Sequence, residues 1–213
     1  MTPAPLTLIG QYDSPFVRRV AITLGIYALP FEHRPWSVWG DADEISAHNP
    51  LRRVPTLLLE DGTALVETFA IVDALDEMVP PERALLPRFG PVRRDGLRIA
   101  ALASGMADKA VSLLYEPMFR ASPSERWADR CRRQIADTLD VLERDRAART
   151  TPFWLGAALT HPDVALPCAL RFTREAHPML FEPARHPTLA EHAARCEDLP
   201  AFRAAYQPIK NNL

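Results

Sequence analysis

The 213-residue chain contains little cysteine, and its cysteines follow no known spacing pattern. The three, Cys131, Cys168 and Cys196, are widely separated. An odd number at such separations is neither a disulfide framework nor a zinc-binding pattern. We therefore expect reduced thiols in a cytoplasmic protein. The six histidines also lack ligand-type spacing such as HxxxH, so no metal is predicted.

Other absences exclude several classes of protein. No stretch approaches the ~20 apolar residues that span a bilayer, and the N-terminal residues lack the basic and apolar segments of a signal peptide. A net charge of −2, with basic clusters interleaved with acidic residues, argues against a nucleic-acid partner. GxGxxG, GxxxxGK[ST] and GxSxG are all missing, which removes the usual markers of dinucleotide binding, NTP hydrolysis and α/β-hydrolase chemistry.

The most informative stretch is residues 49–75, whose pattern predicts a loop, a strand, a turn, a second strand and a helix. Apolar runs at 56–60 and 64–66 flank the turn signal Asp61-Gly62, a hairpin pattern. Thr68 then opens a segment with apolar residues at helical spacing. We predict a β-hairpin followed by a helix.

Two dipeptides in this stretch could bind a ligand. In Val54-Pro55 the proline has no N–H for a strand ladder, and a cis bond would turn the backbone of Val54 outward for pairing. Glu67 and Thr68 lie where strand gives way to helix. There a backbone N–H, a hydroxyl and the positive end of a helix can hold a carboxylate.

The N-terminal residues predict a β-α-β unit. Strands are expected at 6–10 and 31–35, and between them Ser14 as N-cap and Pro15 as first residue open a helix. The polar residues 36–48 are expected to be an irregular loop. The sequence SPFV stands where a redox thioredoxin-like protein carries CxxC, so thiol–disulfide chemistry by the protein itself is not expected.

The pattern changes after a proline-rich linker at 80–91. Residues 92–116 and 124–148 are periodic at 3.6, and two shorter helices follow between 187 and 206. An all-helical second domain is therefore predicted over 92–213, after a first domain over 1–79. Within it, Thr160 and Asp163 form a capping box before an apolar segment, so Asp163 is interpreted as structural.

The run NPLRRVPTLLLEDGTALVETFAIVDALDE resembles the glutathione-binding half of the glutathione S-transferase superfamily. That family has a similar run of asparagine-proline, a basic or amide residue, valine-cis-proline, a hairpin and an acidic-serine pair. Thr68 replaces the usual serine and keeps the hydroxyl. The resemblance extends over nearly the whole chain. It implies an N-terminal thioredoxin-like domain (α/β), an all-α C-terminal domain, a homodimer, and glutathione as co-substrate.

The resemblance also implies a role for Ser14, a hydrogen bond to the glutathione sulfur as in some plant and bacterial classes. A free thiol has a pKa near ~8.5, so only a few per cent is thiolate at neutral pH. A hydrogen bond and a helix dipole both favour the thiolate. Alone, a Ser-Pro at a helix start is usually just a cap. The downstream motifs at the family's spacing favour the functional interpretation.

The other site residues follow from the same resemblance. Arg53 is expected to reach the glycine carboxylate of glutathione, or else to be a solvated loop charge. Val54, before a cis Pro55, should pair with the cysteinyl part. Glu67 should face the γ-glutamyl ammonium while Thr68 holds its carboxylate.

The predicted activity is that of a glutathione transferase that activates the thiol for attack on a small electrophile. The alternatives are a glutathione-dependent isomerase of the same fold and a non-catalytic binding or regulatory protein. Neither the electrophile nor the interface residues can be read from the sequence. Asp108 lies near where the family often places an acidic residue that reaches the neighbouring subunit, although a solvated helix charge explains this residue better.

Overall fold

A computed structural model describes residues 5–209, which form two compact units. Among these residues, the first unit comprises 5–84 together with 199–209, and the second comprises Leu85–Asp198. The segment from Leu199, predicted at the end of the helical domain, therefore packs with the first unit. The domain boundaries at 79 and 92 stay predictions.

The first unit contains a four-stranded sheet in the order β2-β1-β3-β4. Its strands are β1 (Leu6–Ile9), β2 (Phe31–Arg34), β3 (Thr56–Leu58) and β4 (Ala64–Val66). β1 pairs in parallel with β2 and antiparallel with β3, while β3 and β4 form the predicted hairpin. The parallel pairing of the first two strands confirms the predicted thioredoxin-like β-α-β unit.

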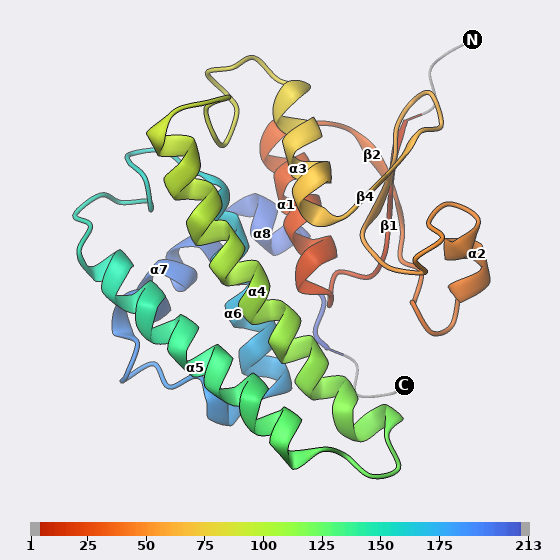
Figure 1. Cartoon of the computed structure of the whole chain (residues 1–213). Coiled ribbons are helices and arrows are strands. Elements are labelled where there is room, and N and C mark those ends of the chain that lie inside the picture. The colour runs from red at the N-terminus through yellow and green to blue at the C-terminus, as the bar shows by residue number, and fades with distance from the viewer. Residues whose placement is uncertain (1–4, 210–213) are drawn as a thin grey trace. The chain divides into compact units, whose positions relative to one another are not determined.

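Helices cover both faces of this sheet. α1 (Pro15–Tyr27) and α3 (Thr68–Glu77) pack together on one side, and α2 (Ala42–Ser46) lies on the other (Figure 1). The expectation of an irregular loop over 36–48 was wrong, because it contains α2. This helix has five residues with one fully buried side chain, Ile45, which is too little to produce a periodic apolar pattern.

A buried arginine attaches the C-terminal segment to the first unit. Arg18 is fully buried on α1 and donates hydrogen bonds to the carbonyls of Phe202 (3.1 Å) and Ala205 (3.0 Å). These carbonyls belong to α8 (Pro200–Ala204) and its C-terminal end. A buried guanidinium needs such partners, so α8 and α1 stabilise each other.

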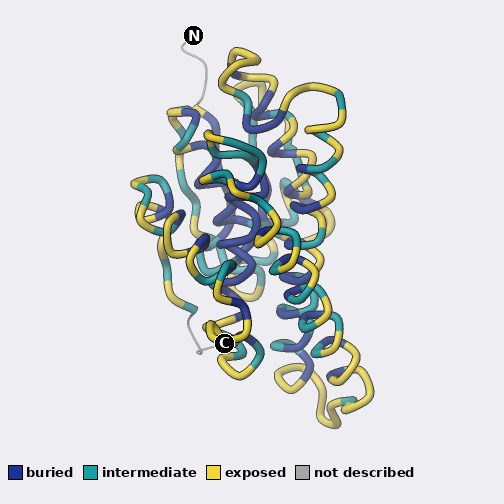
Figure 2. Tube along the Cα trace, turned by 90° about the vertical axis from the view of Figure 1, so that its left-hand side faces the viewer, coloured by how far each residue is buried: buried dark blue, intermediate teal, exposed yellow. Residues whose placement is uncertain are grey.

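Helices are the only regular secondary structure in the second unit, all of whose residues the structure describes. It contains α4 (Pro91–Phe119), α5 (Glu125–Ala147), α6 (His161–Ala176), the 3₁₀ helix η1 (Pro178–Leu180) and α7 (Pro187–Glu197). α4 packs against α5 and α6, and α7 packs against the same two helices. Buried residues recur every three or four positions along α5, as helical periodicity requires, whereas residues 161–170 of α6 are all buried. Figure 2 shows how far the chain is buried along its described residues. The predicted all-helical region is thereby confirmed.

The predicted capping box lies at the N-terminus of α6. Asp163 is fully buried, and its Oδ2 accepts hydrogen bonds from the Thr160 N–H (2.8 Å) and hydroxyl (2.6 Å). Its Oδ1 accepts from the Trp154 N–H (2.7 Å) and lies 3.0 Å from His192 Nε2. The structural interpretation of Asp163 is therefore confirmed, and its carboxylate also fixes the chain before α6.

The three cysteines are buried, and none of them forms a disulfide. Burial raises the pKa of the Cys196 thiol to about 12, so this thiol remains protonated at neutral pH. None of the helices in the described part of the chain is long and apolar enough to cross a membrane.

Candidate functional site

Ser14 precedes α1 and caps it. Its backbone is extended (φ −63°, ψ 125°), and its Oγ accepts a hydrogen bond from the Val17 N–H at 3.4 Å. Pro15 takes the first helical position, where a missing N–H costs nothing. The cap uses a lone pair of the hydroxyl, and the hydroxyl proton has no acceptor within residues 5–209. Ser14 can therefore donate to an anion at the positive end of α1.

Gly10 brings α1 and the segment around Val54 together. It has φ +127°, and a Cβ atom here would lie 2.5 Å from Val17 Cγ2 and 2.8 Å from Val54 Cβ. Both distances are below van der Waals contact, so only glycine permits this approach. The first turn of α1 and the residue before Pro55 therefore meet at the end of β1.

The Val54-Pro55 bond is cis, which confirms the sequence-based prediction. The backbone N–H and C=O of Val54 make no hydrogen bond with the described residues. Asn49, which is 1% exposed, holds this segment by donating from Nδ2 to the Arg53 carbonyl (2.8 Å) and to Thr56 Oγ1 (3.1 Å). The sequence reasoning assigned Asn49 no role, although its position four residues before Arg53 was part of the motif.

Glu67 and Thr68 form the N-terminus of α3. Glu67 has φ +68°, which is unusual for a residue with a side chain, and makes no side-chain cap of the helix. Thr68 is 4% exposed, and its hydroxyl has no hydrogen-bond partner in the described part of the chain. This helix start therefore keeps its N–H groups and the Thr68 hydroxyl available for an anion.

Arg53 lies beside Glu67. Their side chains form an ion pair with Nη1 and Oε1 3.2 Å apart, and both are more than half exposed. The structure thus brings Arg53, Val54, Pro55, Glu67 and Thr68 together in one unit. Through Gly10, the helix capped by Ser14 joins the same region.

Two aromatic rings that the sequence reasoning did not connect fix the loop before Ser14. His33 Nε2 donates to the Gly10 carbonyl at 2.8 Å, and the His33 ring stacks on Tyr12 with centroids 4.0 Å apart. The Tyr12 N–H donates to Gln207 Oε1 at 3.2 Å. Burial raises the pKa of the Tyr12 hydroxyl, so tyrosine is neutral here. These contacts hold the loop from Gly10 to Ser14 between β1 and α1.

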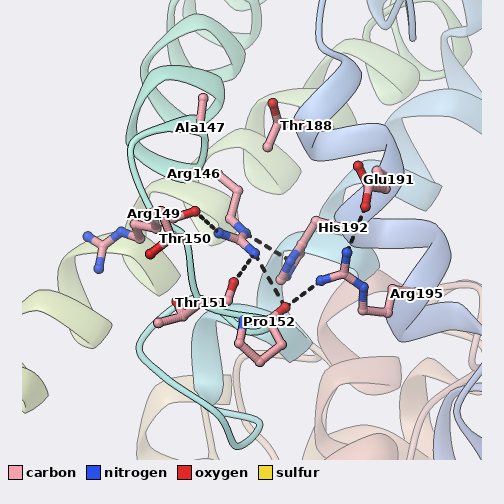
Figure 3. Close-up of a pocket in the computed structure, with 10 residues that line it drawn as sticks. All are labelled: Arg146, Ala147, Arg149, Thr150, Thr151, Pro152, Thr188, Glu191, His192 and Arg195. Carbon is pink, nitrogen blue, oxygen red and sulfur yellow. Dashed lines mark hydrogen bonds and ion pairs between the residues drawn. The ribbon is translucent and has the colours of Figure 1, made fainter.

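A separate pocket of about 480 Å³ lies in the second unit (Figure 3). Its polar lining includes Arg146, Arg195 and His192. Arg146 donates to His192 Nδ1 (3.1 Å) and to backbone carbonyls, and Arg195 pairs with Glu191 (2.7 Å) and donates to the Pro152 carbonyl. These guanidinium groups already bind carbonyls and carboxylates of the protein. We therefore interpret the residues that line the pocket as structural contacts between α5 and α7.

Residues 5–209 contain no group of three or more His, Cys, Asp and Glu side chains arranged to hold a metal ion. Asp108 is half-exposed on α4 and pairs with Lys109 at 2.9 Å. Its role toward a second subunit stays a prediction.

Two family models match the chain. Residues 8–83 match the glutathione S-transferase N-terminal domain and residues 125–195 match the glutathione S-transferase C-terminal domain. Together with the fold, these matches show that the chain belongs to the glutathione S-transferase family.

Among curated relatives, the Escherichia coli K12 "Uncharacterized GST-like protein YibF" is 35% identical over 141 residues, 65% of this chain and 68% of the relative. The probable glutathione S-transferase GSTU6 of Oryza sativa subsp. japonica is 26% identical over 191 residues, 87% of this chain and 81% of the relative.

Solved structures have the same fold over nearly the whole chain. A glutathione S-transferase from Methylobacterium radiotolerans, solved with glutathione sulfonate, has a TM-score of 0.88 and 30% identity, covering 99% of this chain and 100% of its own. A glutathione transferase family member from Pseudomonas fluorescens Pf-5, solved with bound glutathione, has a TM-score of 0.81 and 28% identity, covering 96% and 100%.

Proposed function

We propose that the protein is a serine-type glutathione transferase that activates the glutathione thiol for attack on a small electrophile. The observation that carries the proposal is the set of unengaged polar groups on elements that meet around Gly10 and Val54. These groups are the Ser14 hydroxyl proton, the Val54 backbone and the Thr68 hydroxyl.

Glutathione fits these groups in one extended orientation. Its cysteinyl backbone pairs with Val54, and its γ-glutamyl end lies at Glu67 and Thr68, with Arg53 beside them. The sulfur then lies at the N-terminus of α1, where Ser14 donates a hydrogen bond to it. That bond and the helix dipole stabilise the thiolate over the thiol, which lowers the thiol pKa and supplies the nucleophile.

Ser14→Ala tests the role of the hydroxyl. We expect turnover with an activated aryl halide to fall about 10²-fold, the lower end for losing one donor to an anion, because the helix dipole remains. Affinity for glutathione should change little, while the pKa of the bound thiol, followed by thiolate absorbance, should rise. Glu67→Gln should do the reverse, weakening binding with a smaller change in thiol pKa.

Ser124→Ala is the matched control for the lost helix cap. Ser124 caps α5 by the same contact, accepting from the Trp127 N–H at 3.3 Å, but lies in the second unit. Both alanine variants lose about 1 kcal/mol of capping. Only Ser14→Ala should change the rate and the thiol pKa. If neither changes, Ser14 is a cap, and the activating donor is Tyr12 or a nearby backbone N–H.

The family relationship alone leaves a glutathione-dependent isomerase and a non-catalytic binding protein as alternatives. The unengaged Ser14 proton favours the enzyme. Turnover of a small electrophile panel distinguishes conjugation from isomerisation, and glutathione binding without turnover would favour the binding protein. A homodimer and a cytoplasmic location are part of the proposal. Light scattering that gives the mass of one chain at all concentrations would contradict the dimer.

A further inference from the structure

The pocket in the second unit is lined by more positive charge than its own carboxylate balances. Residues from the end of α5, from the segment 149–152 and from α7 line it, and its volume is about 480 Å³. Pockets that hold small molecules have volumes of roughly 300–1,000 Å³. The charged side chains in its lining are those of Arg146, Arg149, Arg195 and Glu191.

Arg146 is a buried cation whose hydrogen-bond acceptors are neutral. It is 5% exposed and donates to His192 Nδ1 (3.1 Å) and to the carbonyls of Arg149 (3.0 Å) and Thr151 (2.6 Å). Its guanidinium lies between His192 and the Thr151–Pro152 segment (Figure 3). Within residues 5–209 no carboxylate forms an ion pair with it. A buried charge is stabilised best by an opposite charge, which Arg146 lacks among these residues.

A second guanidinium group approaches the same point. Arg195 Nη1 donates to the Pro152 carbonyl at 2.6 Å, and Arg146 Nη2 donates to the same oxygen atom at 3.3 Å. Two positive charges thus converge on one neutral acceptor and repel each other. Burial lowers the pKa of Arg146, and the charges of Arg195 and Arg149 lower it further, although Asp163 opposes them. The electrostatic potential at this point therefore favours an anion.

The carboxylate in the lining is a weak competitor for such an anion. Glu191 Oε1 lies 2.7 Å from Arg195 Nη2, and the two side chains are 75% and 40% exposed. An exposed pair of this kind contributes little to stability, so a ligand can replace Glu191. Thr150 and Thr188 also line the pocket, and neither hydroxyl has a hydrogen-bond partner within residues 5–209. These hydroxyls are two further donors for an anion.

We propose that this pocket binds small organic phosphate monoesters. The site lies wholly within the second unit and goes beyond the proposed function. The phosphate lies against Arg195, which exchanges Glu191 for it, and beside the charge of Arg146. Its three terminal oxygen atoms accept hydrogen bonds from several directions, which suits guanidinium and hydroxyl donors around one point. The rest of the volume holds the organic group, and the bonds to carbonyls that join α5 to α7 stay in place.

Titration calorimetry with phenyl phosphate tests the proposal, and phenol is the matched probe without the anion. At about pH 7.5 most of the phenyl phosphate is a dianion, because the second pKa of such a phosphate is ~6. We expect wild type to bind phenyl phosphate and to give no measurable heat with phenol. Arg195→Gln should weaken phenyl phosphate about ten-fold, as for the loss of one charge-assisted hydrogen bond. Glu191→Gln should strengthen it about three-fold, because a competing carboxylate is removed.

Arg132→Gln is the matched control. Arg132 is 42% exposed, close to the 40% of Arg195, and pairs with Asp129 at 2.8 Å, so its replacement removes the same charge. It lies outside the pocket, about 20 Å along α5 from Arg146. It should change the affinity by less than about two-fold, because exposed charges beyond ~10 Å are screened. Circular dichroism of all variants checks that the fold is intact.

Three results with wild type and the arginine variants would overturn the inference. These are no binding of phenyl phosphate to wild type, equal binding of phenol, and equal penalties for Arg195→Gln and Arg132→Gln. Weaker binding by Glu191→Gln would overturn it as well, because Glu191 would then not be a competitor. This variant also decides the matter if Arg195→Gln does not fold. Glutathione binding is measured separately, so the proposed function stands or fails independently.

Discussion

The N-termini of α6 and α3 solve the same physical problem in opposite ways. Every helix begins with N–H groups that lack intrahelical acceptors. At α6 the protein supplies the acceptors itself, because Asp163 and Thr160 form a buried capping box. At α3 the Glu67 side chain does not cap the helix, and the hydroxyl of Thr68 has no hydrogen-bond partner among the described residues. The first terminus is closed for stability, and the second is open in the way that an anionic ligand requires.

The largest expected effect comes from breaking the closed terminus. Asp163→Ala removes a buried carboxylate that accepts from Thr160 and Trp154 and contacts His192. The donors left behind lose their partners, so we expect a loss of about 3 kcal/mol in the free energy of unfolding. Urea denaturation of wild type and variant measures this loss.

Asp129→Ala is the control for Asp163→Ala. Asp129 lies exposed on α5 and pairs with Arg132 at 2.8 Å, so its removal should leave the denaturation midpoint nearly unchanged. Equal midpoints for the two variants would mean that Asp163 is not a structural cap.

Two isosteric substitutions, one at the N-terminus of α6 and one at that of α3, separate an effect on stability from an effect on glutathione binding. Thr160→Val loses the hydroxyl that donates to Asp163 at 2.6 Å, which should cost about 1.5 kcal/mol of stability without changing glutathione affinity. Thr68→Val loses a hydroxyl that has no partner within residues 5–209, so stability should change by less than about 0.5 kcal/mol. Glutathione affinity should instead fall about ten-fold, through one lost hydrogen bond to a carboxylate.

Chemical denaturation measures the stability of both valine variants, and calorimetric titration measures their affinity for glutathione. A loss of stability in Thr68→Val equal to that in Thr160→Val would show that the α3 terminus is closed as well. Unchanged affinity in Thr68→Val would remove this hydroxyl from the binding site.

The difference between the two termini also explains what the sequence could predict. The capping box, the Ser14 cap, the hairpin and the Val54-Pro55 dipeptide are local signals, in which the interacting residues lie within a few positions of each other. Periodicity likewise predicted the long helices, because each buries a continuous apolar stripe. These features were therefore available from residue order alone.

Contacts between distant residues were not available in this way. His33 reaches the Gly10 carbonyl across 23 positions, and Arg18 on α1 reaches α8 across more than 180. Such pairs leave no period or spacing in one sequence. The same limit applies to the Arg53–Glu67 pair, whose residues were assigned to opposite ends of the ligand. Only the hairpin register brings them together.

The smallest expected effect lies at the other end of the closed helix. His177 is the C-cap of α6, and its Nε2 donates to the Ala110 carbonyl at 2.8 Å. Burial lowers the pKa of His177 and the charge of Arg132 lowers it further, although the bond to Ala110 opposes both. A base with a depressed pKa binds its proton more readily when unfolded. Its contribution to stability is therefore complete above the unfolded pKa of ~6.5 and is lost as pH falls through the folded pKa.

His177→Gln keeps a donor for the Ala110 carbonyl but removes the titration. Unfolding free energies of wild type and variant, measured between pH 7.5 and pH 5, should therefore diverge in slope below about pH 6.5, with wild type losing stability faster. The slope difference cannot exceed about 1.4 kcal/mol per pH unit, the limit for one proton. Parallel curves over this range would mean that His177 titrates alike in both states, and that burial at the end of α6 does not govern its charge.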